Sequence, residues 1–337
     1  MRELSEIAKE FYKQGRRIVA PLMGFPGVGL IGSNIKLAQQ NWGEHYKVIK
    51  ALVDLFSPDI VFPLMDLSVE ANALGRYTIF PREDSATVPK DRFNIEEIEK
   101  LSNINLSFDS RVIGYVETLK LIGIGLPSNV IRGAYVTGPY TLSGLMMGAD
   151  EAAIASVIKK DELHKLCNLS TSKILEYIRL LISAGAEIIC VLEPMAVMLS
   201  PQQFFEFSAS FVKQIAVTCK YNGVNTVYHT CGNTMHLIER MVESEINGIS
   251  LDSKDAGVIL TEVAKRVPEN VIIVGNINPA TTMLFGEPED IKREVTELMD
   301  SMRQYPNFVL STGCDLPQET PIENIRTFMD AGRRWKK

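Results

Sequence analysis

Short, almost uninterrupted apolar runs recur along this chain, and most are followed by a longer segment whose apolar residues have helical spacing. Each run ends at or beside Gly, Pro, Asn or Asp, the residues that commonly end strands. Strands that are apolar on both faces and alternate with helices are typical of a parallel sheet covered by helices. We interpret eight runs as strands, at residues 17–24, 59–66, 130–138, 186–194, 225–231, 247–252, 270–276 and 307–314.

Eight strand–helix units in a chain of 337 residues predict an α/β fold of the (β/α)8 TIM-barrel type, with residues 1–337 as a single domain. The alternative is an open, doubly wound sheet. The segment after the first predicted strand, GFPGVGLIG at residues 24–32, is not interpreted as a Gly-x-Gly-x-x-Gly dinucleotide-binding turn, and it lacks the Lys and Ser/Thr of a phosphate-binding loop. The barrel is therefore favoured.

The predicted helices fill the gaps between these runs. Residues 1–17 have charges every few positions and apolar residues at helical spacing, which indicates an amphipathic N-terminal helix and not a secretory signal. Residues 200–223 begin with Ser-Pro and end with Asn-Gly, and residues 287–305 and 320–334 also begin with helix-start residues. Residues 74–128 are less regular and include FPREDSATVPKDRFNIEEIEKL at residues 80–101, which is rich in charge and Pro. This region predicts an insertion or lid over the barrel mouth.

Composition limits the classes of partner. The net charge is −6 and no block of Lys or Arg occurs, so neither a nucleic-acid partner nor a membrane-surface partner is expected. Apolar runs are too short to span a bilayer. The five cysteines form an odd, scattered set, which indicates a reducing, cytoplasmic location. Small molecules or other proteins are the expected partners.

One imidazole and two thiols fall at strand ends. His229 and Cys231 close the fifth predicted strand, and Cys314 closes the eighth. In a barrel, the chemistry is located where strands end. Residues two apart in a strand point to the same face, so the His–Cys pair can face a thiolate from the eighth strand. Such a set suits zinc with an open fourth position. The alternative is structural burial, which we expect for Cys167, Cys190 and Cys219.

Acidic residues follow other predicted strands. Asp66 ends the second strand, with Glu70 shortly after it, and Glu193 lies at the end of the fourth. We expect catalytic roles for these three: a fourth zinc ligand, an acceptor for the imidazole N–H, or a proton acceptor for a thiol. Each could equally be a helix N-cap or part of a loop salt bridge. The same alternatives apply to Asp252, which ends the sixth strand and is expected to bind substrate.

Small and amide residues at further strand ends suit a polar substrate. These predicted substrate-binding positions are Gly24, Gly138, Thr141, Asn276 and Asn278. Their backbone, hydroxyl and amide groups offer hydrogen bonds, although turn formation alone also explains Gly and Asn at such places.

Four segments together resemble one enzyme superfamily. VYHTCGNT, LEPMAVMLSPQQFFEF, VGNINPATTMLFGEPEDI and STGCDLPQETPIENI, in the chain at residues 227–234, 192–207, 274–291 and 311–325, are similar to the uroporphyrinogen decarboxylase superfamily. Within it they most resemble the methylcobamide:coenzyme M methyltransferases. The resemblance extends from about residue 21 to the C-terminus, which is nearly the whole chain.

The resemblance implies a (β/α)8 barrel that moves a methyl group from a corrinoid, held on a separate corrinoid protein, to a thiol such as coenzyme M. It implies that His229, Cys231 and Cys314 are the zinc ligands. Zinc would make the thiol a thiolate, which is the nucleophilic form. Decarboxylases of this superfamily have an Arg-rich motif near residues 23–34, where this chain has none, and a His in place of Cys314.

Other functions remain open. The methyl acceptor could be tetrahydrofolate or a thiol such as homocysteine. The chain could also be a divergent decarboxylase, or a non-catalytic partner of a corrinoid protein. For the sulfonate of coenzyme M, Arg76, Arg132 and the GFPGVG loop at residues 24–29 are alternative binding groups.

Overall fold

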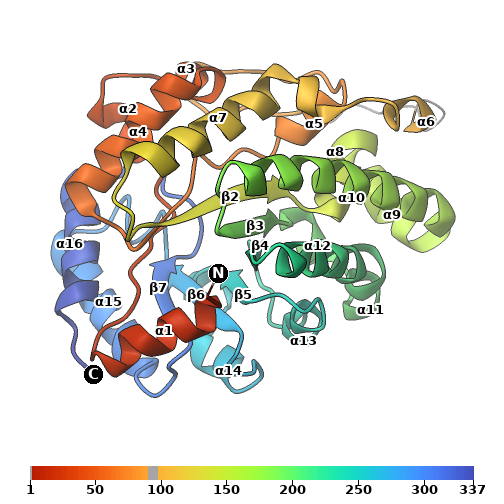
Figure 1. Cartoon of the computed structure of the whole chain (residues 1–337). Helices are drawn as coiled ribbons and strands as arrows, with labels where there is room; N and C mark the ends of the chain where they lie inside the picture. The colour runs from red at the N-terminus through yellow and green to blue at the C-terminus, as the bar shows by residue number, and fades with distance from the viewer. Residues whose placement is uncertain (1, 90–97) are drawn as a thin grey trace.

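The computed structural model describes residues 2–89 and 98–337. Within them, parallel strands pair in sequence order from β1 to β7, and the sheet curls with helices outside it (Figure 1). This order differs from that of a doubly wound sheet, in which the strand order reverses near the middle. The strands are β1 Ile60–Val61, β2 Ile131–Thr137, β3 Ile188–Leu192, β4 Asn225–Thr230, β5 Gly248–Leu251, β6 Ile272–Ile277 and β7 Phe308–Thr312.

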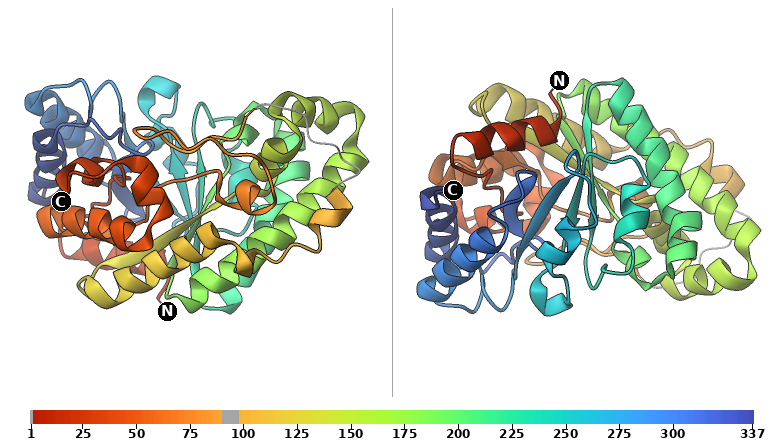
Figure 2. Two further views of the ribbon diagram at one scale, coloured as in Figure 1. Left: turned by 90° about the horizontal axis from the view of Figure 1, so that it is seen from above. Right: turned by 90° about the horizontal axis from the view of Figure 1, so that it is seen from below.

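Helices precede and separate the strands. In the two views of Figure 2 the strands lie in the middle, with the red, orange and blue helices on one side and the green helices on the other. The α-helices are α1 Leu4–Lys13, α2 Pro26–Leu30, α3 Ile35–Gln40, α4 Trp42–Phe56, α5 Val69–Ala73, α6 Ile98–Leu101, α7 Ser110–Gly125, α8 Pro139–Met147, α9 Ala149–Ile158, α10 Lys160–Ser183, α11 Pro201–Phe204, α12 Ser210–Tyr221, α13 Ile238–Val242, α14 Leu260–Ala264, α15 Pro288–Ser301 and α16 Ile322–Arg334. Shorter helical turns are η2 Leu106–Phe108, η3 Pro194–Met198, η4 Phe205–Ala209 and η5 Lys254–Ala256.

The two edges of the sheet meet through the segment predicted as the first strand. In place of an eighth strand, residues 17–24 provide one parallel bridge, between Val19 and Leu310 of β7. Ala20 N donates to Leu310 O at 2.9 Å, and on the other side Asp59 N donates to Val19 O at 3.1 Å. The barrel prediction is therefore confirmed as a curled parallel α/β sheet of seven strands, and the prediction of an eighth regular strand is wrong.

The inside of the curled sheet is apolar along most of its depth. Its cluster includes Ile188, Cys190 and Leu192 of β3 together with Val227 and Val274 of neighbouring strands. Helix α1, as predicted from its amphipathic pattern, adds Leu4 and Ala8 to this cluster, and Leu4 N donates to Asn225 Oδ1 at the start of β4. Helix α1 therefore closes the amino-terminal end of the barrel, which leaves the carboxyl-terminal end for a site.

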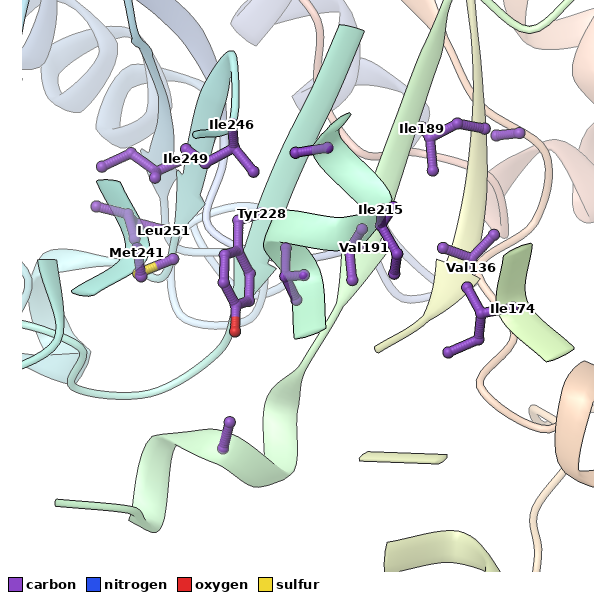
Figure 3. Packing of buried hydrophobic residues seen from close by; sticks show 14 of the residues in the cluster. Val136, Ile174, Ile189, Val191, Ile215, Tyr228, Met241, Ile246, Ile249 and Leu251 are labelled. Carbon is purple, nitrogen blue, oxygen red and sulfur yellow. The ribbon is translucent and has the colours of Figure 1, made fainter. Parts of the chain in front are cut away.

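The outward faces of the strands hold the helices in place. Figure 3 shows Val136 of β2, Ile189 and Val191 of β3 and Ile249 of β5 facing this outer layer. The helices contribute Ile174 of α10, Ile215 of α12 and Met241 of α13. All of these side chains are buried. Apolar residues on both the inward and the outward faces of the strands explain why the strands appear in the sequence as largely apolar runs.

The predicted insertion over residues 74–128 is only partly irregular. Residues 79 and 87 form an isolated antiparallel bridge, and residues 90–97 of this prediction lie outside the described part. Residues 110–125 form a regular helix, α7, whose first turn is capped because Asp109 Oδ1 accepts from Arg111 N and Val112 N. Helix α7 packs on α4 and β2 and is the ordinary crossover helix before β2, so the predicted boundary at residue 128 is wrong.

Two helical predictions also change in detail. The segment at residues 200–223 is one continuous helical run, but a π-helical turn, η4, separates α11 from α12. The segment at residues 24–32, taken as a loop, contains the short helix α2. Gly27, Gly29 and Gly32 do have Gly-x-Gly-x-x-Gly spacing. In dinucleotide-binding proteins this motif lies in the turn between a β-strand and a long helix, whereas here the three glycines lie in and just after the short helix α2.

Among the helices of residues 2–89 and 98–337, none alone is long and apolar enough to cross a bilayer. Helices α8 and α9 reach that length and composition only as a pair bent by 110°.

Candidate functional site

Three predicted ligand residues meet at the carboxyl-terminal end of the barrel. His229 Nε2 lies 3.2 Å from Cys231 Sγ and 3.8 Å from Cys314 Sγ, and the two sulfur atoms are 3.3 Å apart. His229 is buried, and the two cysteines are partly exposed. The structure thus brings together one imidazole nitrogen and two thiols that the sequence places up to 85 residues apart.

Strand geometry explains how this cluster forms. His229 is the inward residue after Val227 in β4, and Cys231 follows two positions later, immediately beyond the strand. Gly232 then turns the chain with φ +85°, a conformation that favours glycine, and its N–H donates to Asp252 Oδ2 at 2.7 Å. Cys314 follows β7 in the same way, so the strand ends determine where the ligands lie.

The donor set fits zinc. Tetrahedral Zn²⁺ with bonds of about 2.3 Å to sulfur and 2.0–2.1 Å to nitrogen places its ligand atoms roughly 3.5–3.8 Å apart. The observed separations of 3.2, 3.3 and 3.8 Å come close to that triangle. Among the described residues, His229, Cys231 and Cys314 are the group of metal-binding side chains close enough to hold one ion. Three protein ligands leave a fourth position open, which is the pattern of a catalytic zinc site.

The Cys314 thiol is hydrogen-bonded and largely enclosed in the protein without a cation. The hydrogen bond with Cys231, together with burial, raises the pKa of the Cys314 thiol well above its usual value. A bound cation reverses this preference because coordination stabilises the thiolate. Cys314 would therefore become a thiolate on binding a cation.

Asp315 lies directly beside this site, and sequence reasoning missed it. Its Oδ1 accepts from Gly24 N at 3.2 Å and from Leu316 N at 3.0 Å, which ties the loop after β7 to the segment after Met23. Burial raises the pKa of the Asp315 carboxyl to about 7. The signal that could have found it is its position next to Cys314 after a strand, which is the criterion that selected the other acidic residues.

Glu193 occupies a different environment from the metal ligands. It follows β3 directly and, like Val191 two positions earlier, lies on the outward side of the strand. Its side chain is fully buried. Its carboxylate accepts from Tyr140 N and Thr141 N, at 2.9 and 2.8 Å, in the first turn of α8. Ser208 Oγ of η4 also donates to it, at 2.8 Å. Burial raises the pKa of Glu193. The structure therefore shows Glu193 in helix-capping contacts, which was the alternative role considered for it. A catalytic role stays a prediction.

Asp66 is part of a buried ion pair. Its carboxylate contacts the Arg111 guanidinium, and it also accepts from Tyr115 OH at 3.0 Å and from Ser68 Oγ at 2.6 Å. The Asp66 side chain is wholly buried. These partners satisfy the carboxylate, so a salt-bridge role is what the structure displays for Asp66.

Glu70 is a buried carboxyl at the carboxyl-terminal end of β2. It accepts from the Thr137 backbone N–H at 2.8 Å and from Thr137 Oγ1 at 2.9 Å. Burial raises the pKa of Glu70 to about 7, which lies in the range of a proton acceptor that works near neutral pH. Its catalytic role stays a prediction.

The predicted substrate-binding residues at the ends of β5 and β6 form hydrogen bonds that link the two loops following these strands. Asn276 Nδ2 donates to Asp252 O at 2.8 Å and to Val258 O at 3.0 Å. Asn278 Nδ2 donates to Asp255 Oδ2 at 2.7 Å, and its Oδ1 accepts from Ala280 N. Asp252 itself accepts from Gly232 N. These contacts organise the rim beside Cys231, and the structure tests no substrate contact.

The remaining predicted substrate-binding residues, Gly24, Gly138 and Thr141, are closely packed against other protein atoms. Gly138 precedes α8, and an added Cβ there would overlap the Glu193 side chain. At Gly24 a Cβ would lie 3.1 Å from Leu64 Cα. Thr141 is buried in α8, and its Oγ1 accepts from Met195 N at 3.3 Å. Close packing therefore accounts for both glycines independently of any ligand.

Two of the three groups considered for a sulfonate are already bound to protein atoms. Arg132 lies at the amino-terminal end of β2, away from the ligands, and pairs with Glu187 at 2.9 Å, so its assignment to the site is wrong. Arg76 donates to Leu145 O and to Pro89 O, both at 3.1 Å. Cys167, Cys190 and Cys219 are buried in the core, as predicted.

Comparison with known proteins agrees with the four motifs. The uroporphyrinogen decarboxylase (URO-D) family model matches residues 38–335. A uroporphyrinogen decarboxylase from Prochlorococcus marinus (strain MIT 9312) is 26% identical over 299 residues, covering 86% of this chain and 83% of that protein. The methylcobamide:CoM methyltransferase MtbA of Methanosarcina acetivorans is 28% identical over 250 residues, covering 72% and 69%.

A solved structure shows the same fold. A methyltransferase from Methanosarcina mazei superposes with a TM-score of 0.86 over 98% of both chains, at 21% sequence identity. This chain is thus similar in sequence to relatives named for decarboxylation and for methyl transfer, and the resemblance noted from the sequence is confirmed. The chain belongs to the uroporphyrinogen decarboxylase (URO-D) family of enzymes.

Proposed function

We propose that this protein is a zinc-dependent methyltransferase that moves a methyl group from a methylated corrinoid, carried by a partner corrinoid protein, to a small thiol such as coenzyme M. The observation that carries the proposal is the convergence of His229 Nε2, Cys231 Sγ and Cys314 Sγ within 3.8 Å of one another at the barrel mouth. The similarity to a methylcobamide:CoM methyltransferase supports the same reaction class.

In this proposal, His229, Cys231 and Cys314 hold the zinc. When bound there, zinc would lower the pKa of an incoming thiol so that it binds as a thiolate. Burial of His229 excludes water from one side of the site, and the partial exposure of both cysteines leaves the other side open to substrates. A thiolate sulfur then forms the bond to the methyl carbon, while the cobalt–carbon electron pair stays with the corrinoid. The thiol ligands imply a reducing, cytoplasmic location.

A decarboxylase is the second candidate, because several curated relatives carry that name. The charges near the site support it less well, since a substrate with many carboxylates needs cations. A cavity of about 460 Å³ beside Asp315 has no Lys or Arg among the described residues that line it. Its lining is Phe25, Ile35, Glu83, Asp84, Ser85, Asp315, Leu316, Pro317, Gln318 and Glu319.

The experiment is a metal analysis combined with a transfer assay. The protein purified without added metal should contain about one zinc per chain, and Cys314→Ala should lose both the zinc and the activity. Cys219→Ala removes a buried thiol outside the site, so it should keep both. Methylcobalamin is supplied with coenzyme M, homocysteine or tetrahydrofolate as acceptor. Full activity of a metal-free Cys314→Ala protein, or decarboxylation without methyl transfer, would refute the proposal.

A further inference from the structure

The two ring nitrogens of His229 face different neighbours. Nε2 faces the two thiols, whereas Nδ1 lies 3.0 Å from Ser250 Oγ. His229 is 1% exposed and Ser250 is 2% exposed, so solvent does not compete for this contact. The imidazole therefore has a protein hydroxyl on the side opposite the candidate metal position.

The strand register places these two side chains together. His229 in β4 pairs with Ser250 in β5 in the parallel ladder, and residues in register on adjacent strands lie side by side on one face. Val227 and Val274, which surround this pair on the inner face, belong to the apolar interior cluster. Ser250 is thus a polar side chain in an otherwise apolar layer, and the polar group that it meets is His229.

The chemistry of the ring gives this contact a consequence. A neutral imidazole carries one N–H, and its other nitrogen is the ligand. Hydrogen on Nδ1, donated to Ser250 Oγ, leaves the Nε2 lone pair directed at the thiols. Hydrogen on Nε2 would occupy the place of the metal. A hydrogen bond to the second nitrogen is the usual means by which a protein orients a histidine ligand.

We propose that Ser250 is a positioning residue of the metal centre: its hydroxyl accepts the Nδ1 hydrogen of His229 and holds Nε2 toward Cys231 and Cys314. The identity of the metal as zinc rests on the proposed function. The orientation of the ring itself rests on the contact between Ser250 and His229 and exists in the metal-free protein.

The first test measures zinc affinity by competition with a chromophoric chelator. Ser250→Ala should weaken zinc binding about 10- to 100-fold, the range typical for loss of a partner of a ligating histidine. Ser250→Thr keeps the hydroxyl and should restore most of the affinity. Ser311→Ala is the matched control: Ser311 is an equally buried serine in β7 whose Oγ donates to Ala20 O at 2.7 Å, and its loss should leave zinc affinity near that of the parent.

The second test determines which ring nitrogen of His229 carries the hydrogen in the metal-free protein. The chain has four histidines, so ¹⁵N-histidine labelling resolves each ring by long-range ¹H–¹⁵N correlation. The metal-free parent should show His229 with hydrogen on Nδ1, and Ser250→Ala should shift that resonance. Hydrogen on Nε2 in the parent, or unchanged zinc affinity in a folded Ser250→Ala protein, would overturn the proposal.

The two measurements separate this inference from the proposed function. A parent protein that binds no zinc but shows Nδ1–H on His229 would remove the methyltransferase proposal and keep the Ser250 contact. If Ser250→Ala fails to fold, the parent spectrum and the Ser250→Thr affinity still decide the question.

Discussion

Cys231 Sγ lies 3.3 Å from Cys314 Sγ, although 83 residues separate the two thiols in the chain. A disulfide has its sulfur atoms about 2.05 Å apart, so a small movement would suffice to join them. Cys167, Cys190 and Cys219 are buried, whereas Cys231 and Cys314 are partly exposed and adjacent to each other. The two site thiols are therefore the pair most open to oxidation.

We predict that hydrogen peroxide converts these two thiols to a disulfide in the metal-free protein. Five free thiols should fall to three in a titration of the denatured protein. Zinc added before the peroxide should protect the pair, because the ligands are then occupied. In Cys231→Ser the intramolecular disulfide should not form. A disulfide mapped to any other cysteine pair would contradict the observed geometry.

Gly138→Ala should destabilise the protein. The added methyl overlaps Glu193, whose carboxylate caps α8, and overpacking of this kind costs about 1–3 kcal/mol. Gly114→Ala is the matched control, since nothing lies within 4 Å of a Cβ at that position in α7. It should be neutral or stabilise by about 0.5–1 kcal/mol. Urea unfolding of both variants measures the difference, and equal effects would show that the space around Gly138 is not tight.

Arg111→Ala should be costly because it leaves the Asp66 carboxylate buried without its cation. Breaking a buried pair in this way costs about 3–5 kcal/mol. The exposed Arg334–Asp330 pair of α16 provides the comparison, and Arg334→Ala should cost less than about 0.5 kcal/mol. The double replacement Asp66→Asn with Arg111→Met should recover part of the loss. A mild effect of Arg111→Ala on the unfolding free energy would mean that water reaches Asp66.

Glu70 should make stability depend on pH. Its pKa is about 7 in the folded protein, against 4.5 as the ordinary value, so the folded form retains a proton that the unfolded chain releases above pH 4.5. The stability contributed by this proton is fully present below pH 4.5 and is lost as the pH rises through 7. The slope reaches at most about 1.4 kcal/mol per pH unit.

Glu70→Gln should therefore reduce the fall in unfolding free energy between pH 5 and pH 7.5, measured by urea unfolding of the metal-free protein. Glu289→Gln, at a largely exposed position in α15, should leave that fall unchanged. Asp315 contributes with the same sign and is present in all three proteins. The same pH dependence in the parent and Glu70→Gln would refute this assignment.

Most of the strands were predictable because they are apolar on both faces. The two predicted strands that the structure shortens most, residues 17–24 and 59–66, contain proline, which removes a backbone donor. Pro21 follows Ala20, whose N–H makes the last backbone–backbone bond of this segment to β7, and Pro63 follows shortly after β1. Helix α7 was missed because the charged segment before it dominated the interpretation of that region, although Asp109 is a recognisable N-cap.

The convergence of His229, Cys231 and Cys314 was predictable because strand alternation and strand ends depend on local sequence. The same alternation, applied to Leu192 as an inward residue, would have placed Glu193 on the outward side. The Ser250 contact was not predictable, since it requires knowing which residue of β5 stands beside His229 in the register. Contacts across strands are set by tertiary pairing, and one sequence does not contain the register explicitly.

The bridge between Val19 and Leu310 bears on how the protein emerges during translation. Leu310 N donates to Ile18 O, and Ala20 N donates to Leu310 O. These bonds join residues near both ends of the sequence, so a nascent chain cannot close the ring of strands until β7 has left the ribosome. Contacts of such long sequence separation form late and slowly. Cys314 follows β7 by two residues, so every shorter nascent intermediate lacks one thiol of the cluster. Ring closure and completion of the His229, Cys231 and Cys314 cluster therefore belong to the same late stage of synthesis.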